Sequence, residues 1–147
     1  IAGETLLCHA LKAISPFEEK LLSADRLGRD EGDVPADVRI VPDAYPGGGA
    51  IVGILSALER CSSDRLVAVA ADMPFVTGDF LEALVKRMPP EVDVLLPRTR
   101  DGQLHPLCAV YHKRIVPLLR ERVDRVDVGD RVGPYPPAAA RGHPLCG

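Results

Sequence analysis

The sequence predicts an α/β fold of three layers (α/β/α), in which helices cover both faces of a mostly parallel sheet. Its 147 residues are enough for one domain with a substantial core. Residues 66–71 (LVAVAA) form a short, continuous apolar run, as in a strand buried on both faces. Strand-like and helix-like segments alternate along the chain, and this alternation favours such an architecture.

The elements follow from local patterns. Apolar residues at positions 6, 7, 10, 11 and 14 form one helical face, and Pro16 ends that helix. Thr77 is suited to cap a later helix, with Asp79 in its first turn. In chain order we expect a helix at 4–14, strands at 20–24 and 38–41, a helix at 50–60, a strand at 66–71, a helix from Thr77 to about residue 88, strands at 92–96 and 105–111, and a helix at 112–123.

One α/β domain is expected over residues 1–125. Residues 126–147 are rich in proline and glycine and have no clear periodicity, so we predict an irregular tail there. The net charge of −3 argues against a nucleic-acid or anionic-membrane surface. No apolar run approaches the roughly 20 residues of a membrane span. Widely spaced cysteines and the absence of a visible secretory signal favour a cytoplasmic protein.

Asp72 is the most informative candidate for a functional residue. It directly follows the apolar run, and Pro74 prevents the strand from continuing. The carboxyl end of a strand is where open α/β sheets bind ligands. One or two carboxylates, with phosphate and water, are typical ligands of Mg²⁺, so Asp72 is a candidate metal and nucleotide ligand. The alternative is a turn or helix-capping residue.

Two further acidic residues follow strands, namely Asp25 after 20–24 and Asp43 after 38–41. If these strands run parallel to 66–71, the three carboxylates converge at one edge of the sheet. Each of the two is also explained by an exposed loop. Gly47, Gly48 and Gly49 lead directly into a helix, where free N–H groups attract anions. A glycine-rich turn before a packed helix is the alternative there.

Gly53 lies one turn into the same helix and would allow a ligand or a strand to pack closely. His105 precedes a proline at the start of a predicted strand. A lone histidine in that position is more often structural than functional.

Three segments together resemble the molybdenum cofactor guanylyltransferases, which have the nucleotidyltransferase fold of the sugar-nucleotide pyrophosphorylases. They are GGGAIVGILSAL, VAVAADMPFVTGDFLEALV and DVLLPRTRDGQLHPLCAVY, within a match over about residues 2–120. The resemblance implies a Rossmann-like fold and a transferase that uses Mg²⁺. GMP would be transferred from GTP to a molybdopterin cofactor, with release of pyrophosphate. Other proteins of molybdenum cofactor assembly would be partners.

The resemblance also implies roles for individual residues. Asp72 matches the family's catalytic, metal-binding and nucleotide-binding aspartate, and Asp43 matches an acidic position near GTP. Asp25 stands where the family usually has asparagine at a nucleotide contact. Gly49 and Gly53 match the glycines of a GPLAG-like loop near the pterin substrate, although the loop here reads GAIVG. His105, in the third segment, is a candidate substrate contact.

Two departures from the family pattern lead to further expectations. The family's N-terminal strand with its LAGGxSxRMGxDK loop, and its C-terminal NxNTPxD-like segment, have no counterpart here. We therefore expect a fold that is incomplete at its N-terminus, and little or no transferase activity from this chain alone. The alternatives are a related cytidylyltransferase or sugar-phosphate nucleotidyltransferase, or an inactive truncated homologue.

Overall fold

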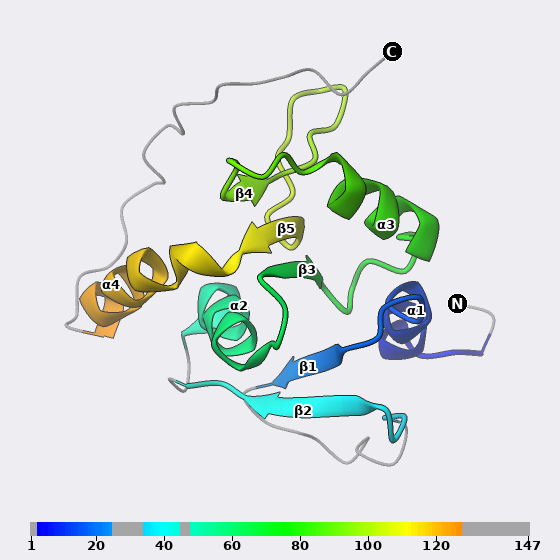
Figure 1. Ribbon diagram of the computed structural model, residues 1–147. Coiled ribbons are helices and arrows are strands. Elements are labelled where there is room, and N and C mark those ends of the chain that lie inside the picture. Colours follow the sequence, from blue (N-terminus) through cyan, green and yellow to red (C-terminus); the bar gives the residue numbers. More distant parts are fainter. Residues whose placement is uncertain (1–2, 25–33, 45–47, 128–147) are drawn as a thin grey trace.

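The computed structural model describes residues 3–24, 34–44 and 48–127 (Figure 1). The elements in chain order are α1 (Leu6–Ala13), β1 (Lys20–Ala24), β2 (Val38–Pro42), α2 (Gly49–Arg60), β3 (Arg65–Val69), α3 (Gly78–Arg87), β4 (Val94–Leu95), β5 (Cys108–His112), the 3₁₀ helix η2 (Lys113–Ile115) and α4 (Val116–Asp127). None of the helices within these ranges has the length and apolarity needed to cross a membrane.

The strands form two sheets. In the first, β1 and β2 pair in parallel, with Lys20 opposite Val38 and Ala24 opposite Pro42. In the second, β5 lies between β3 and β4 and runs antiparallel to both. The α/β class is confirmed, but the pairing differs from the predicted mostly parallel sheet. Among the described strands, nothing pairs with the edge of β1 opposite β2 or with the edge of β3 opposite β5.

The second sheet has helices on both faces, because side chains of β5 alternate between them. Ala109 and Tyr111 pack with Leu58 of α2 in one buried cluster. Cys108 packs with Leu81 of α3 in a second cluster, on the other face. Helix α4 adds Val123 to the α2 side, beside Val52 and Leu55. These contacts give the predicted three layers around β5.

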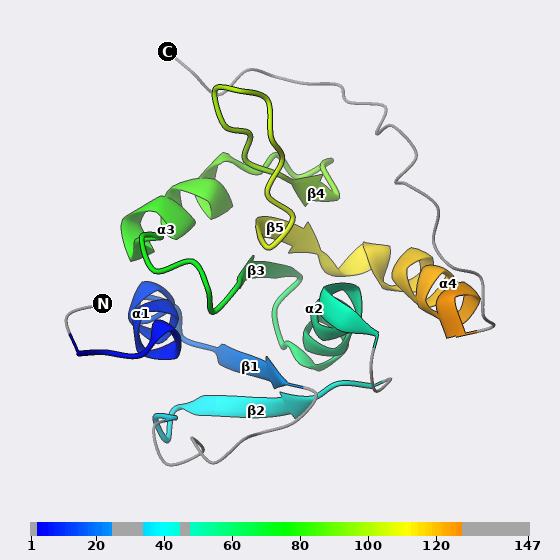
Figure 2. The ribbon, with the colours of Figure 1, turned by 180° about the vertical axis from the view of Figure 1, so that it is seen from behind.

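The two sheets are held together mainly by helices. Helix α2 contacts β1 and β2 of the first sheet and β3 of the second. Helix α1 contacts α3, which itself packs on β5. Figures 1 and 2 show α1 and α2 on opposite sides of the space between β1 and β3.

Most predicted boundaries lie within two residues of the observed ones. Strand β3 ends at Val69, because residues 71–72 already form a turn. Strand β4 has only two residues, and β5 begins at Cys108 rather than at residue 105. Helix α4 continues to Asp127, so the first two residues of the predicted tail are helical. The rest of that tail lies outside the described residues.

Candidate nucleotide-binding site

The ends of β1 and β2 lie side by side, and this arrangement positions Asp43. Parallel pairing places Ala24 opposite Pro42, so the carboxyl ends of both strands lie at the same edge of this sheet, and Asp43 directly follows β2 there. The Ser23 hydroxyl donates a hydrogen bond of 2.5 Å to Oδ1 of Asp43. Both side chains are half-buried, so the carboxylate is oriented by a neighbouring strand but still reaches solvent. Asp25, the other predicted acid of this edge, lies outside the described residues.

Gly53 allows α2 to pack closely on Ser23 and Asp43. A Cβ atom at Gly53 would lie 3.3 Å from Oγ of Ser23 and 3.8 Å from Oδ1 of Asp43. The first distance is tighter than an ordinary van der Waals contact. The structure therefore brings Gly53 and Asp43 together, with Ser23 as a third member. Sequence reasoning missed Ser23; its position two residues before Asp25, near the end of a predicted strand, was the available signal.

Among the described residues, no side chain caps the start of α2. Its N-cap, Gly48, has no side chain to bond the first N–H groups. Gly49 has φ = +66°, a left-handed conformation that glycine adopts without penalty. The Ala44 N–H donates a 2.8 Å hydrogen bond to Oγ of the fully buried Ser56, which ties the segment after β2 to α2. The first two turns of α2 are thus held against the segment of Asp43 and Ala44, and a helix N-terminus of this kind is suited to bind an anion.

Asp72 is exposed in the turn that follows β3. The Met73 N–H bonds the Ala70 carbonyl at 3.2 Å and closes this turn. Helix α3 is capped by Thr77, whose hydroxyl accepts a bond from the Phe80 N–H, so Asp72 is not the cap. No hydrogen bond or ion pair connects Asp72 with Asp43 in the described part of the chain.

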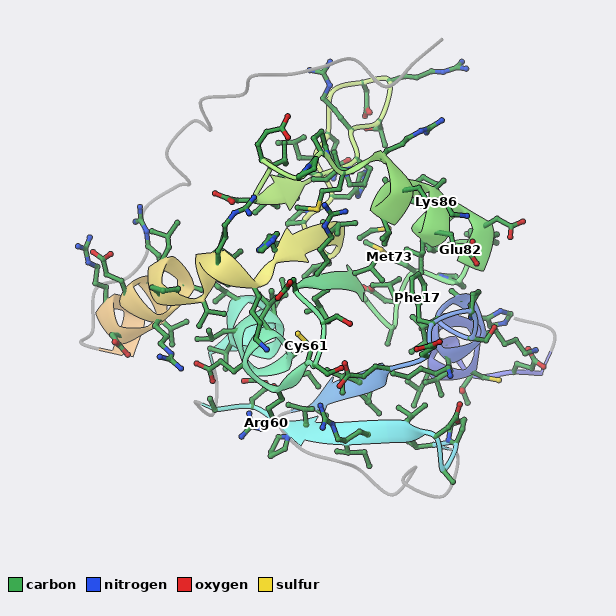
Figure 3. All side chains as sticks on the ribbon, viewed as in Figure 1. Phe17, Arg60, Cys61, Met73, Glu82 and Lys86 are labelled. Atoms are coloured by element: carbon green, nitrogen blue, oxygen red, sulfur yellow. The ribbon has the colours of Figure 1, made fainter. Side chains whose placement is uncertain are left out.

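A cavity of about 650 Å³ extends from the Ser23–Gly53 contact to the residues just before Asp72. Ser23 and Gly53 line it, and so do Ala70 and Ala71, which immediately precede Asp72. Phe17 and Met73 lie near each other between α1 and α3, where both pack against the Ala13 cluster (Figure 3). The turn that carries Asp72 is therefore fixed to the core through Met73.

A magnesium site needs few protein ligands, and the residues present fit that requirement. Within the described ranges, no three His, Cys, Asp or Glu side chains form a cluster that could hold a metal ion. Mg²⁺ is usually bound by one or two carboxylates, with water and substrate phosphates as its other ligands. The exposed carboxylate of Asp72 suits such a site, whereas a site built only from protein ligands does not fit.

His105 lies on the loop before β5. Its backbone N–H donates to the Pro97 carbonyl at 3.1 Å, and its carbonyl accepts from the Cys108 N–H. Its Nε2 atom is buried and has no hydrogen-bond partner. On the same loop, the Thr99 hydroxyl bonds Asp101 and lowers the pKa of that carboxyl. The backbone bonds account for a structural role, and a substrate contact by His105 stays a prediction.

Comparison with known proteins identifies the family. The model of the MobA-like NTP transferase domain matches residues 1–132. A probable molybdenum cofactor guanylyltransferase of Chloroflexus aggregans is 36% identical over 121 residues, which cover 80% of this chain and 57% of that protein. The molybdenum cofactor guanylyltransferase of Bradyrhizobium is 31% identical over 135 residues, 87% of this chain and 63% of its own length. The chain thus spans a little over half of these relatives.

Solved structures agree with this result. Molybdopterin-guanine dinucleotide biosynthesis protein A from Archaeoglobus fulgidus has a TM-score of 0.70 at 26% identity, over 86% of this chain and 63% of that one. A 2-C-methyl-D-erythritol 4-phosphate cytidylyltransferase from Thermus thermophilus, at 18% identity and a TM-score of 0.52, shares the fold over 90% of this chain and 71% of its own. The resemblance inferred from the three sequence segments is confirmed: the chain belongs to the MobA-like NTP transferase domain family of nucleotidyltransferases.

Proposed function

We propose that this chain is part of a molybdenum cofactor guanylyltransferase, which transfers GMP from GTP to a molybdopterin cofactor. The observation that supports this most strongly is the arrangement of Ser23, Asp43 and Gly53 beside the uncapped start of α2. It combines an oriented carboxylate with backbone donors for phosphate, at the edge formed by the parallel strands. Curated relatives with this activity support the choice of substrates.

The proposed reaction is a displacement at the α-phosphorus of GTP. An oxygen of the cofactor's terminal phosphate forms a bond to that phosphorus. The bond to the oxygen that bridges to the β-phosphate breaks, and its electron pair leaves with pyrophosphate. Such transfers depend mainly on positioning and on neutralising the phosphate charge. Mg²⁺, when bound, would supply that neutralisation.

Each candidate residue has a definite part in this scheme. Asp72 would hold the metal and is the proposed catalytic residue, and Asp43 would contact the nucleotide, as would Asp25. Gly49 and Gly53 would let the molybdopterin substrate approach α2, with His105 as a further contact. A cytoplasmic location and an association with cofactor-assembly proteins also stay predictions.

Calorimetric titration with Mg-GTP tests the assignment. We expect D72N to weaken Mg-GTP binding at least about tenfold, about 1.4 kcal/mol, because the metal loses a charged ligand. D79N is the matched control: it removes the same charge from an exposed residue in the first turn of α3 and should leave binding unchanged. Equal affinities of D72N and the unmodified chain would remove Asp72 from the metal site.

Competition between nucleotides tests the choice of base. The proposal predicts that GTP displaces a labelled GTP analogue more effectively than CTP does. A clear preference for CTP would overturn the guanylyltransferase assignment in favour of a cytidylyltransferase.

A further inference from the structure

A short hairpin, residues 97–105, connects β4 with β5 beside the turn that carries Asp72. Both β3 and β4 run antiparallel to β5, so their carboxyl ends lie at the same edge of the second sheet. The Ala70 N–H bonds the Leu107 carbonyl at 2.8 Å, which extends the pairing of β3 with β5 to the residue two positions before Asp72. The 97–105 hairpin therefore leaves the sheet next to this aspartate, and Figures 1 and 2 show it projecting beyond β4 and β5.

Hydrogen bonds within the hairpin fix its shape. The His105 N–H donates to the Pro97 carbonyl at 3.1 Å, and the Thr99 N–H donates to the Gln103 carbonyl at 2.9 Å. The Gly102 N–H donates to the Thr99 carbonyl at 2.9 Å and closes the tip, where Gly102 has φ = +91°. A turn followed by a left-handed glycine is a common three-residue hairpin loop. The hairpin is thus ordered by its own backbone rather than by packing against a neighbour.

Two unpaired cations stand on this hairpin. Residues 98–104 are all exposed, and Arg98 and Arg100 are among them. Within the described part of the chain, neither arginine forms an ion pair or a side-chain hydrogen bond. By contrast, Arg114, just after the far end of β5, bonds Asp93 and two backbone carbonyls. The arginine at the far edge serves the fold, whereas the two at the edge of Asp72 are open to an anion.

The spacing of the strands places the hairpin within reach of a ligand at Asp72. Neighbouring strands lie about 4.8 Å apart, and the order β3-β5-β4 puts the end of β4 two spacings, about 10 Å, from the end of β3. An arginine side chain and a bound chain of phosphates together bridge such a gap. Because the protein has a net charge of −3, a polyanionic ligand also needs local positive charge to approach. Arg98 and Arg100 supply it at the required edge.

We propose that Arg98 and Arg100 form a phosphate-binding arm of the nucleotidyltransferase site and contact a phosphate group of one substrate. The inference rests on the proposed function, in which both substrates carry phosphate: GTP has a triphosphate, and the molybdopterin cofactor ends in a phosphate monoester. Guanidinium groups suit both, because their paired N–H donors match two phosphate oxygens. The arm would attract and orient the substrate, and it takes no part in bond breaking.

Calorimetric titration of the full chain with two probes tests the arm. The probes are Mg-GTP and 6-hydroxymethylpterin monophosphate, which present the phosphates of the two substrates separately. We expect R98A/R100A to weaken the binding of at least one probe about tenfold or more, and the weakened probe identifies the phosphate that the arm contacts. R98K/R100K should bind that probe with intermediate affinity, because lysine keeps the charge but lacks the paired N–H donors.

Arg87 provides the matched control. It is exposed, forms no ion pair within the described residues, and ends α3 before β4 begins, at the edge opposite the hairpin. R87A should therefore bind both probes as the unmodified chain does. Its midpoint of unfolding in urea, like that of R98A/R100A, should stay unchanged because no contact is lost. Equal weakening by R87A and R98A/R100A would refute the arm in favour of unspecific attraction by surface charge.

The remaining outcomes separate the arm from the proposed function. If D72N weakens Mg-GTP binding but R98A/R100A binds both probes normally, the arm is refuted and the proposed function stands. If neither probe binds the unmodified chain, the proposed function fails, and titration with inorganic tripolyphosphate decides on the arm alone. Tripolyphosphate binding that R98A/R100A loses would support a phosphate site on the hairpin, and its absence would refute one.

Discussion

Replacement of Gly53 by alanine should reveal a coupling between α2 and β1. Gly53 lies inside α2, where exchanging glycine for alanine stabilises a helix by about 1 kcal/mol. The new methyl group would lie 3.3 Å from Oγ of Ser23, so the hydroxyl must move. That hydroxyl donates to Asp43, and a lost hydrogen bond of this kind costs about 1 kcal/mol. The two effects cancel, and G53A should change the free energy of unfolding by less than about 0.5 kcal/mol.

The cancellation disappears when the hydroxyl is removed first. In an S23A background the nearest remaining atom is Cβ of residue 23, 3.7 Å from the added methyl group, which is an ordinary contact. G53A should then stabilise the chain by about 1 kcal/mol. A double-mutant cycle in urea measures the difference between the two backgrounds, and we expect a coupling energy of about 1 kcal/mol. Stabilisation by about 1 kcal/mol in both backgrounds would refute the reasoning.

Gly49 provides the matched control. Alanine at φ = +66° is strained, by about 1 kcal/mol or more, but among the described residues the added Cβ meets no heavy atom within 4 Å beyond its chain neighbours and the backbone of α2. G49A should therefore destabilise the chain equally with and without the Ser23 hydroxyl.

Three further predictions concern other parts of the chain. T77A should lower the free energy of unfolding by about 1 kcal/mol because α3 loses its N-cap hydrogen bond, while T77S should change it little. Equal destabilisation by both substitutions, or by neither, would contradict the capping role of Thr77. Burial raises the pKa of the Cys61 and Cys108 thiols above the ordinary 9.0, so both should react slowly with Ellman's reagent at neutral pH. Because the raised pKa belongs to the folded state, the contribution of the two thiols to stability is fully present below about pH 9 and is lost at higher pH. Urea titrations from pH 7 to 10.5 should show a decline in the free energy of unfolding that the C61A/C108A variant lacks. Hydrogen bonds from Ser62 lower the pKa of Glu19, so stability from this contact should be present above about pH 4.5 and fall with acidification, and S62A should flatten that fall between pH 5 and 3.

Local patterns were sufficient to predict most of the elements. The cap at Thr77, the apolar face of α1 and the run before Asp72 are short-range signals, because each depends on residues within one or two turns. Strand pairing is a long-range property. No local signal indicates that β5 runs antiparallel to β3, so the predicted mostly parallel sheet was not observed.

The candidate site was predicted in part for the same reason. The carboxylate of Asp43 was found because it follows a strand, whereas its partner Ser23 is 20 residues away in sequence. Only the parallel register of β1 and β2 brings them together. The close approach of α2 to Ser23 explains why a residue without a side chain stands at position 53. The substrate contact predicted for Gly53 stays a prediction. The metal role of Asp72 likewise stays a prediction.

The separation of the two sheets has a consequence for how the chain unfolds. No strand hydrogen bond joins β1–β2 to β3–β5–β4 within the described residues, so cooperativity between them depends chiefly on α2, on the contact of α1 with α3, and on the Ser62–Glu19 hydrogen bonds between the segments before β3 and β1. Units that share no strand ladder open more independently than units that do. The amides between β1 and β2 should therefore exchange through an opening of lower free energy than those between β3 and β5. The molecule would then have two folding units of different stability.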